Sequence, residues 1–161
     1  MRGFVPYTIA AVVFALDRLT KRIIENSMSV FDTHTVIPGF FDIVHARNRG
    51  AAFSMFADST SPLRSFVLIG LSLAALALVA GMLRNASRLD RFTVIGLSLI
   101  LGGAVGNVFD RIMSGAVTDF LDFYIGELHW PAFNVADSAI VIGSGLLLIS
   151  LFKPKQQTAG A

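Results

Sequence analysis

The sequence contains no cysteine and little charge. Without a cysteine the chain can form no disulfide, no thiolate nucleophile and no cysteine metal site. Charged residues make up 15% of its 161 residues, whereas roughly 25% is typical of soluble domains. The net charge of +2 is too small to indicate binding of nucleic acid. The three histidines lack the spacing of metal ligands, so we expect no metal site. They are His34, His45 and His129.

Apolar residues make up 54% of the chain and gather in long stretches without charge. Residues 65–83 and 92–109 contain no charged residue, and about 20 helical residues at ~1.5 Å each cross a ~30 Å hydrocarbon core. Two further apolar stretches are interrupted or bordered by charge. Residues 3–16 continue into charged residues, and residues 131–152 contain Asp137. We expect an all-α membrane protein with four transmembrane helices. These are predicted at about residues 4–24, 65–83, 92–111 and 134–152.

The first apolar stretch could instead be a cleaved signal peptide. However, no small-residue cleavage site follows it, and Asp17 and Arg18 stand where such a site would lie. We therefore expect residues 1–161 to form a single membrane-embedded domain. Its long loops, 25–64 and 112–133, would then lie on the side of the membrane opposite the termini.

Charge near the helix ends bears on the orientation of the chain. Cytoplasmic loops are enriched in Lys and Arg, but the two sides hold six and seven of the 13 basic residues, which leaves the orientation open. The short loop 84–91 carries three arginines, and this density favours cytoplasmic termini. Within the long loops, the β-branched and aromatic residues 35–44, interrupted by Pro38-Gly39, predict a strand, a turn and a second strand, and residues 116–123 predict a further strand. We expect them to form a small extracytoplasmic β-sheet.

Polar side chains cluster near one end of the predicted helices. Asp17 and Lys21 are spaced i, i+4, so they can pair on one helix face, and this could be a purely structural ion pair. The groups near the ends of the third and fourth helices are Asn107, Asp110, Arg111, Asn134 and Asp137. A charged group inside a membrane costs at least ~2.5 kcal/mol, so such groups are candidates for a functional site.

Asp119 and Asp137 are the favoured catalytic pair. Two carboxylates at an apolar site cannot both ionise at low cost, so they share a proton. The ionised member can activate a water, and the protonated member can give its proton to a leaving amine. This is the chemistry of aspartic proteases. Arg111 and Asn107 could orient the two acids. Asn48 or Asn134 could form hydrogen bonds with the substrate backbone.

Each of these residues also has a structural interpretation. Asp137 and Asn134 could cap the fourth helix. Asp119 could be an ordinary solvated acid in a loop, and Arg111 could anchor its helix by reaching the lipid headgroups. Glycines in the run 102–106 are typical of close helix packing.

Five short motifs follow one another along the chain. They are Asp17-Arg18-Leu19-Thr20-Lys21, Asn48-Arg49-Gly50-Ala51-Ala52-Phe53, the run 102–111 ending in Asn107-Val108-Phe109-Asp110-Arg111, Val117-Thr118-Asp119-Phe120 and Phe133-Asn134-Val135-Ala136-Asp137. Each motif alone is weak, but all five in order resemble the lipoprotein signal peptidases (signal peptidase II), which are bacterial intramembrane aspartyl endopeptidases. The resemblance extends over essentially the whole chain.

The resemblance implies roles for the residues of these motifs. Asp119 and Asp137 would be the catalytic dyad. The residues that line or support the site would be Asn48, Gly50, Asn107, Arg111, Asn134, Asp17 and Lys21. The family cuts a signal peptide just before a cysteine that carries a diacylglyceryl group. The implied partners are diacylglyceryl-modified prolipoproteins, membrane lipids and globomycin-type inhibitors, with no cofactor or metal and with a monomeric enzyme.

The resemblance also implies a location. The protein would be a multi-pass protein of the bacterial cytoplasmic (inner) membrane, with cytoplasmic termini and an extracytoplasmic active site. A lipid anchor would hold the scissile bond near the membrane surface, where the dyad is expected, and would supply part of its positioning. Two other classes stay open from the residues alone. Intramembrane acids also mark the ion pathways of small transporters or proton-coupled channels, and they can pair helices in a non-catalytic assembly factor.

Overall fold

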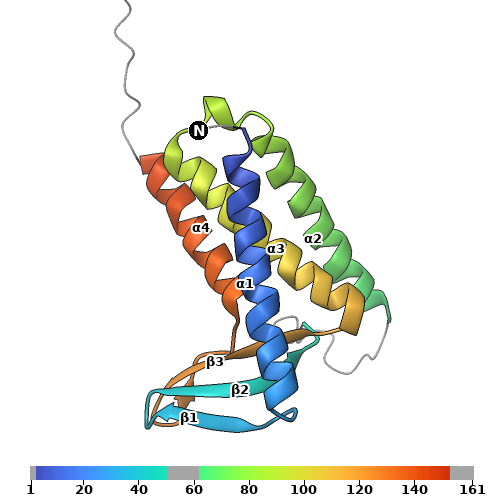
Figure 1. The fold of residues 1–161 in the computed structure, drawn as a ribbon, viewed down its shortest axis with the longest axis vertical. Coiled ribbons are helices and arrows are strands. Elements are labelled where there is room, and N and C mark those ends of the chain that lie inside the picture. The colour runs from blue at the N-terminus through green and yellow to red at the C-terminus, as the bar shows by residue number, and fades with distance from the viewer. Residues whose placement is uncertain (1–2, 51–61, 153–161) are drawn as a thin grey trace, which may run out of the picture.

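The computed structural model describes residues 3–50 and 62–152. Within these residues the chain forms four long helices and one four-stranded antiparallel sheet (Figure 1). The helices are α1 (Val5–Ser27), α2 (Pro62–Leu83), α3 (Arg91–Ser114) and α4 (Val135–Phe152), with a short 3₁₀ turn, η2 (Ala86–Arg88), between α2 and α3. The strands are β1 (Thr33–Ile37), β2 (Phe41–Asn48), β3 (Val117–Ile125) and β4 (Leu128–His129).

Three of the helices are long and apolar enough to cross a membrane: α2, α3 and α4. All four predicted helices are present, with ends that differ by up to three residues from those expected. Helix α1 has 23 residues, but its second half carries charged side chains such as Asp17 and Lys21. For this reason its membrane span stays a prediction, although the helix itself is confirmed.

Helix α3 lies at the centre of the bundle and packs against α1, α2 and α4. Its glycines allow this close packing. A Cβ on Gly102 would lie 2.5 Å from the backbone oxygen of Ala10, and one on Gly103 would lie 2.4 Å from that of Ala136. Any larger residue at these two positions would push α1 or α4 away. The predicted packing role of the glycine run is therefore confirmed.

The sheet lies at one end of the bundle, and the N-terminal end of α1 lies at the other (Figure 1). Its strand order is β1-β2-β3-β4. Strands β1 and β2 are joined by a turn in which Gly39 has a φ of 76°, as the predicted strand-turn-strand pattern requires. Strand β3 pairs with β2, and Ala46 lies opposite Asp119. The two-residue strand β4 was not predicted.

The end of α3 leads directly into the sheet. Gly115 ends the helix in the left-handed conformation, with a φ of 70°, and its N–H donates to the carbonyl of Arg111 at 3.1 Å. Strand β3 begins two residues later, at Val117. This sharp turn places Asp119 beside the last turns of α3 and the first turn of α4.

Candidate active site

Helix α4 begins with two reciprocal hydrogen bonds between Asn134 and Asp137. The Asp137 N–H donates to Oδ1 of Asn134 at 2.9 Å, and the Asn134 N–H donates to Oδ2 of Asp137 at 3.3 Å. These bonds form a capping box. A carboxylate from α1 joins them, because the Ala136 N–H donates to Oδ1 of Asp17 at 2.9 Å. Both expected caps are thus present, and the side-chain amide of Asn134 and Oδ1 of Asp137 make further contacts.

Two asparagines connect the carboxylates of Asp119 and Asp137. The amide of Asn107 donates to Oδ1 of Asp137 at 2.8 Å. The amide of Asn134 donates to Oδ1 of Asp119 at 2.7 Å and lies 3.4 Å from Oδ1 of Asn107. The structure thus brings together two acids that are 18 residues apart in the sequence. Their side chains belong to one hydrogen-bonded cluster at the meeting point of α3, α4 and β3.

Asp119 is almost fully buried, with 3% of its surface exposed. Burial is the main reason that its pKa rises to about 6, and a hydrogen bond from Asn48 opposes the rise. The negative charge of Asp137 raises the pKa of Asp119 further, and the hydrogen bond from Asn134 lowers it. A carboxyl group with a pKa near the working pH can both take and give a proton, as acid–base catalysis requires.

Lys21 joins the site to α1 through a buried ion network. Its Nζ lies 2.8 Å from Oδ2 of Asp17, 2.7 Å from Oδ2 of Asp110 and 3.0 Å from Oδ1 of Asn107. Asp110 also pairs with Arg18. The side chains of Asp17 and Lys21 are fully buried. The expected pair on α1 is therefore present, and its Lys21 holds the side chain of Asn107 by a hydrogen bond to Oδ1.

The sequence analysis gave Arg18 no role, and it named Asp110 only as one of the polar groups near the helix ends, although both lie within its motifs. A possible signal was their opposite charge beside residues that were singled out, since Arg18 follows Asp17 and Asp110 is three residues after Asn107. The pairing itself was not predictable, because 92 residues separate the two partners.

Arg111 lies half-buried at the end of α3. One guanidinium nitrogen donates to the backbone oxygen of Asn107 at 3.2 Å. Among the described residues its buried Nε has no hydrogen-bond partner. The charge of Arg111 interacts with the carboxylates of Asp137 and Asp119. This environment favours a role for Arg111 in orienting the carboxylates of Asp119 and Asp137 over a role as an anchor in the lipid headgroups.

Asn48 reaches the site from the end of β2, where it pairs with Val117. Its side chain bonds to the carboxylate of Asp119. Its Oδ1 accepts from the N–H of Gly50 at 2.7 Å. Gly50 has a φ of 95°, a conformation that favours glycine, so it supports the position of Asn48.

The last three residues of the second motif, 51–53, lie outside the described residues. In the part of the chain that the structure describes, no group of three His, Asp or Glu side chains is arranged to hold a metal ion.

The chain is similar to known proteins over nearly its whole length. A family model described as signal peptidase (SPase) II matches residues 9–153. A lipoprotein signal peptidase of Solibacter usitatus is 61% identical over 153 residues, which are 95% of this chain and 93% of that protein. A lipoprotein signal peptidase of Maridesulfovibrio salexigens is 44% identical, over 94% of this chain and 97% of that protein. A solved structure of a bacterial membrane enzyme matches with a TM-score of 0.81 and 32% identity, over 92% of this chain and 93% of that one.

Proposed function

The chain belongs to the signal peptidase II family, and on this premise we propose that it removes the signal peptide from diacylglyceryl-modified prolipoproteins. It acts as an intramembrane aspartyl endopeptidase and cuts just before the lipid-modified cysteine. The observation that carries this proposal is the linkage of Asp119 and Asp137 through Asn107 and Asn134. Membership of a peptidase family also argues against a transporter or an assembly factor.

In the proposed mechanism the two acids share one proton. The ionised acid takes a proton from a water molecule as the water oxygen attacks the scissile carbonyl carbon. The protonated acid polarises the carbonyl oxygen, and a proton then passes to the leaving amine as the C–N bond breaks. Asp119 is the candidate for the protonated member, because burial raises its pKa to about 6. Asp137 is then the candidate base.

The surrounding residues position the dyad and the substrate. We assign Asn107 and Arg111 to orientation of the acids, and Asn48 and Asn134 to hydrogen bonds with the substrate backbone. Gly50 supports Asn48 through its N–H. The remaining support comes from α1, where Asp17 caps α4 and Lys21 holds Asn107. No step in this mechanism uses a cofactor or metal.

The placement of the site in the bundle agrees with a lipid-anchored substrate. Asp137 lies at the start of α4, and Asp119 lies on β3 beside the end of α3. Both helices are long and apolar enough to span a membrane. A diacylglyceryl anchor would hold the scissile bond at this depth. We propose a single-domain, monomeric protein of the bacterial cytoplasmic (inner) membrane with four spans, cytoplasmic termini and an extracytoplasmic site that globomycin-type inhibitors block.

A cleavage assay tests this function. Purified protein is mixed with a diacylglyceryl-modified prolipoprotein, and release of the signal peptide is followed on gels. The variants Asp119→Asn and Asp137→Asn are each expected to lose at least about 10²–10⁴-fold in rate, the usual contribution of acid–base catalysis. Thermal unfolding of each variant checks that folding persists.

Asp122→Asn is the matched control for this assay. Asp122 lies three residues after Asp119 on β3, and its carboxylate bonds to His129 at 2.9 Å, away from the dyad. This control is expected to cleave at the wild-type rate. Full cleavage by either dyad variant would exclude the proposed dyad.

A further inference from the structure

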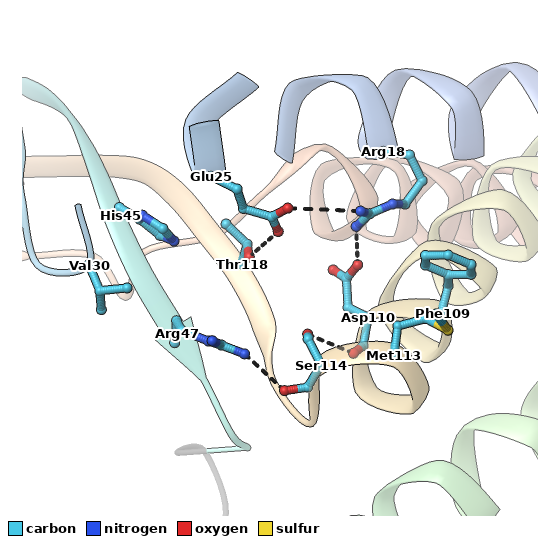
Figure 2. Close-up of a pocket in the computed structure, with 10 residues that line it drawn as sticks. All are labelled: Arg18, Glu25, Val30, His45, Arg47, Phe109, Asp110, Met113, Ser114 and Thr118. Carbon is cyan, nitrogen blue, oxygen red and sulfur yellow. Dashed lines mark hydrogen bonds and ion pairs between the residues drawn. The ribbon is translucent and has the colours of Figure 1, made fainter. Parts of the chain in front are cut away.

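A pocket lies behind strand β3, between α1, β2 and the end of α3 (Figure 2). Its volume is about 310 Å³, and Thr118 lines it. Successive side chains of a strand point to opposite faces, so Asp119, the next residue, points away from this pocket. The pocket is therefore distinct from the proposed active site.

Two arginines approach this pocket from opposite sides (Figure 2). Arg18 pairs with Asp110, lies 4.0 Å from the carboxylate of Glu25 and stacks over the ring of Phe109. A guanidinium nitrogen of Arg47 donates to the backbone oxygen of Ser114 at 2.8 Å. A guanidinium has five N–H donors in a planar fork that suits phosphate oxygens. The described contacts use only some of these donors. This half of the pocket is therefore suited to an anionic phosphate group.

An adjoining pocket of about 500 Å³ is lined by carboxylates and, among the described residues, by no lysine or arginine. It shares Glu25, Val30 and His45 with the first pocket and is also lined by Asp32. Its wall includes the last residues of α1, where the helix dipole is negative. The last turn of α1 has no basic residue to balance that charge. This half of the site therefore favours a cation.

The first pocket lies at the end of a candidate membrane span, where lipid headgroups would be expected. Phe109, Met113 and Ser114 of its lining belong to the last turns of α3, which is long and apolar enough to span a membrane. Beside it, the side chains of Phe109, Ile112 and Met113 are spaced i, i+3, i+4 and are 38%, 60% and 69% exposed. This apolar stripe leads from the pocket along α3 toward the hydrocarbon core.

We propose that the two adjoining pockets together bind the headgroup of phosphatidylethanolamine, a phospholipid that carries both a phosphate and a primary ammonium group. The phosphate binds Arg18 and Arg47, and the ammonium group binds Glu25 and Asp32. The acyl chains follow the apolar stripe. The volume of the first pocket is near the lower limit for small-molecule sites, which suits a headgroup better than an acyl chain. This inference rests on the membrane placement of α3 and not on peptidase activity.

A binding experiment in detergent tests the site. Dihexanoyl phospholipids with ethanolamine, choline or glycerol headgroups are titrated into the purified full-length protein, and binding is measured by isothermal titration calorimetry. The ethanolamine lipid is expected to bind saturably and at least tenfold more tightly than the choline lipid, which has no N–H donors. Arg47→Gln and Glu25→Gln are each expected to weaken binding roughly tenfold, as the loss of one charge-assisted hydrogen bond predicts.

Arg22→Gln is the matched control, because Arg22 is an exposed arginine of the same helix that does not line either pocket. Its affinity is expected to stay at the wild-type value. Equal binding by all the variants, or tighter binding of the choline or glycerol lipid, would overturn the proposal. Equally tight binding of water-soluble glycerophosphoethanolamine would show that the acyl chains contribute nothing, and it would overturn a membrane lipid as the ligand. Melting temperatures confirm that each variant is folded, and the Asp119→Asn variant is expected to bind like the wild type.

Discussion

The two ends of the helix bundle are held together by different forces. At the end away from the sheet, an apolar cluster joins α2, η2 and α3 and includes the buried side chains of Leu83, Val94 and Leu97. At the sheet end, buried Asp17, Lys21 and other charged groups join α1, α3 and α4. Apolar packing tolerates substitution when volume is kept, whereas a buried charge requires a partner in a fixed position.

This difference indicates where stability and function lie. Replacement of a buried ion pair by apolar residues is often neutral or stabilising, so such a pair is weak evidence for a purely structural role. The charged network holds Asn107 and the start of α4, both of which contact Asp137. We infer that the sheet end maintains a specific arrangement of the acids and that the other end mainly contributes packing.

The largest effect on stability is expected from Lys21→Met. This change leaves Asp17 and Asp110 buried with less compensating charge, and the removal of one partner from a buried pair costs about 3–5 kcal/mol. Leu97→Met is the matched change in the apolar end and should cost less than about 1.5 kcal/mol. Unfolding in mixed detergent micelles measures both. Equal stability of the two variants would remove the contrast between the ends.

A second test of the sheet end uses pH. The folded-state pKa of Asp119 is about 6, above its ordinary value of 3.8, so the folded protein binds a proton more tightly than the unfolded chain. Its contribution to stability is therefore present below about pH 4 and is lost as the pH rises through about 6, by up to about 3 kcal/mol. Unfolding free energies measured from about pH 4 to pH 7 should show Asp119→Asn gaining stability relative to the wild type.

Asp122→Asn controls for titration elsewhere in β3. A stability difference between Asp119→Asn and the wild type that does not change with pH would contradict the raised pKa.

In the cleavage assay the shared proton predicts that the rate falls on both the acid and the alkaline side. A rate that is flat over the whole range would argue against a shared proton.

A smaller effect is expected at Gly106 on α3, where close helix packing meets the buried carboxylate of Asp17. A Cβ at this position would lie 2.4 Å from Oδ2 of Asp17. Gly106→Ala should therefore cost about 1–3 kcal/mol through overpacking, and it should lower cleavage by displacing the carboxylate that caps α4. Gly145→Ala on α4 is the control, because a Cβ there meets nothing within 4 Å. Equal activity of both variants would show that the position of Asp17 does not matter.

The smallest effect is expected at the other end, from Asp90→Ala. Asp90 caps α3 by accepting from the N–H groups of Phe92 and Thr93, and a hydrogen bond from Ser150 is the main cause that lowers its pKa to about 2. Loss of such a cap costs about 1 kcal/mol. Cleavage should be unchanged, and Asp90→Asn should restore most of the stability. A loss of activity with Asp90→Ala would mean that the two ends are coupled.

Much of the fold could be predicted because its signals are local. Uncharged stretches such as 65–83 reveal membrane helices directly, since the hydrocarbon core selects for apolar residues along the whole segment. The β-branched and aromatic stretches 35–44 and 116–123 revealed the strands β1, β2 and β3. The extra turn of α1 up to Ser27 was missed, because residues 25–27 are all polar and the apolar signal ends at Ile24.

The candidate site was only partly predictable. Its acids and amides were recognised because polar groups are rare near membrane helices and because their motifs resemble a known family. Their hydrogen bonds were not predictable, since Asn107 and Asp137 are 30 residues apart in the sequence. The hydrogen bond from Thr118 to Glu25, on the side of β3 that faces the first pocket, joins residues 93 apart and had no sequence signal.

The sequence by itself determined the four helices, the strands β1, β2 and β3, the family resemblance and the choice of Asp119 and Asp137 as candidate catalytic residues, because these depend on residue type and spacing along the chain. Only the tertiary structure decided which groups touch. The close packing of α1 and α4 on the glycines of α3 brings Asp17, Lys21 and Asn107 together, and the turn at Gly115 carries Asp119 to Asn134. Burial in that packing is also what raises the pKa of Asp119, a property that a residue type alone does not have.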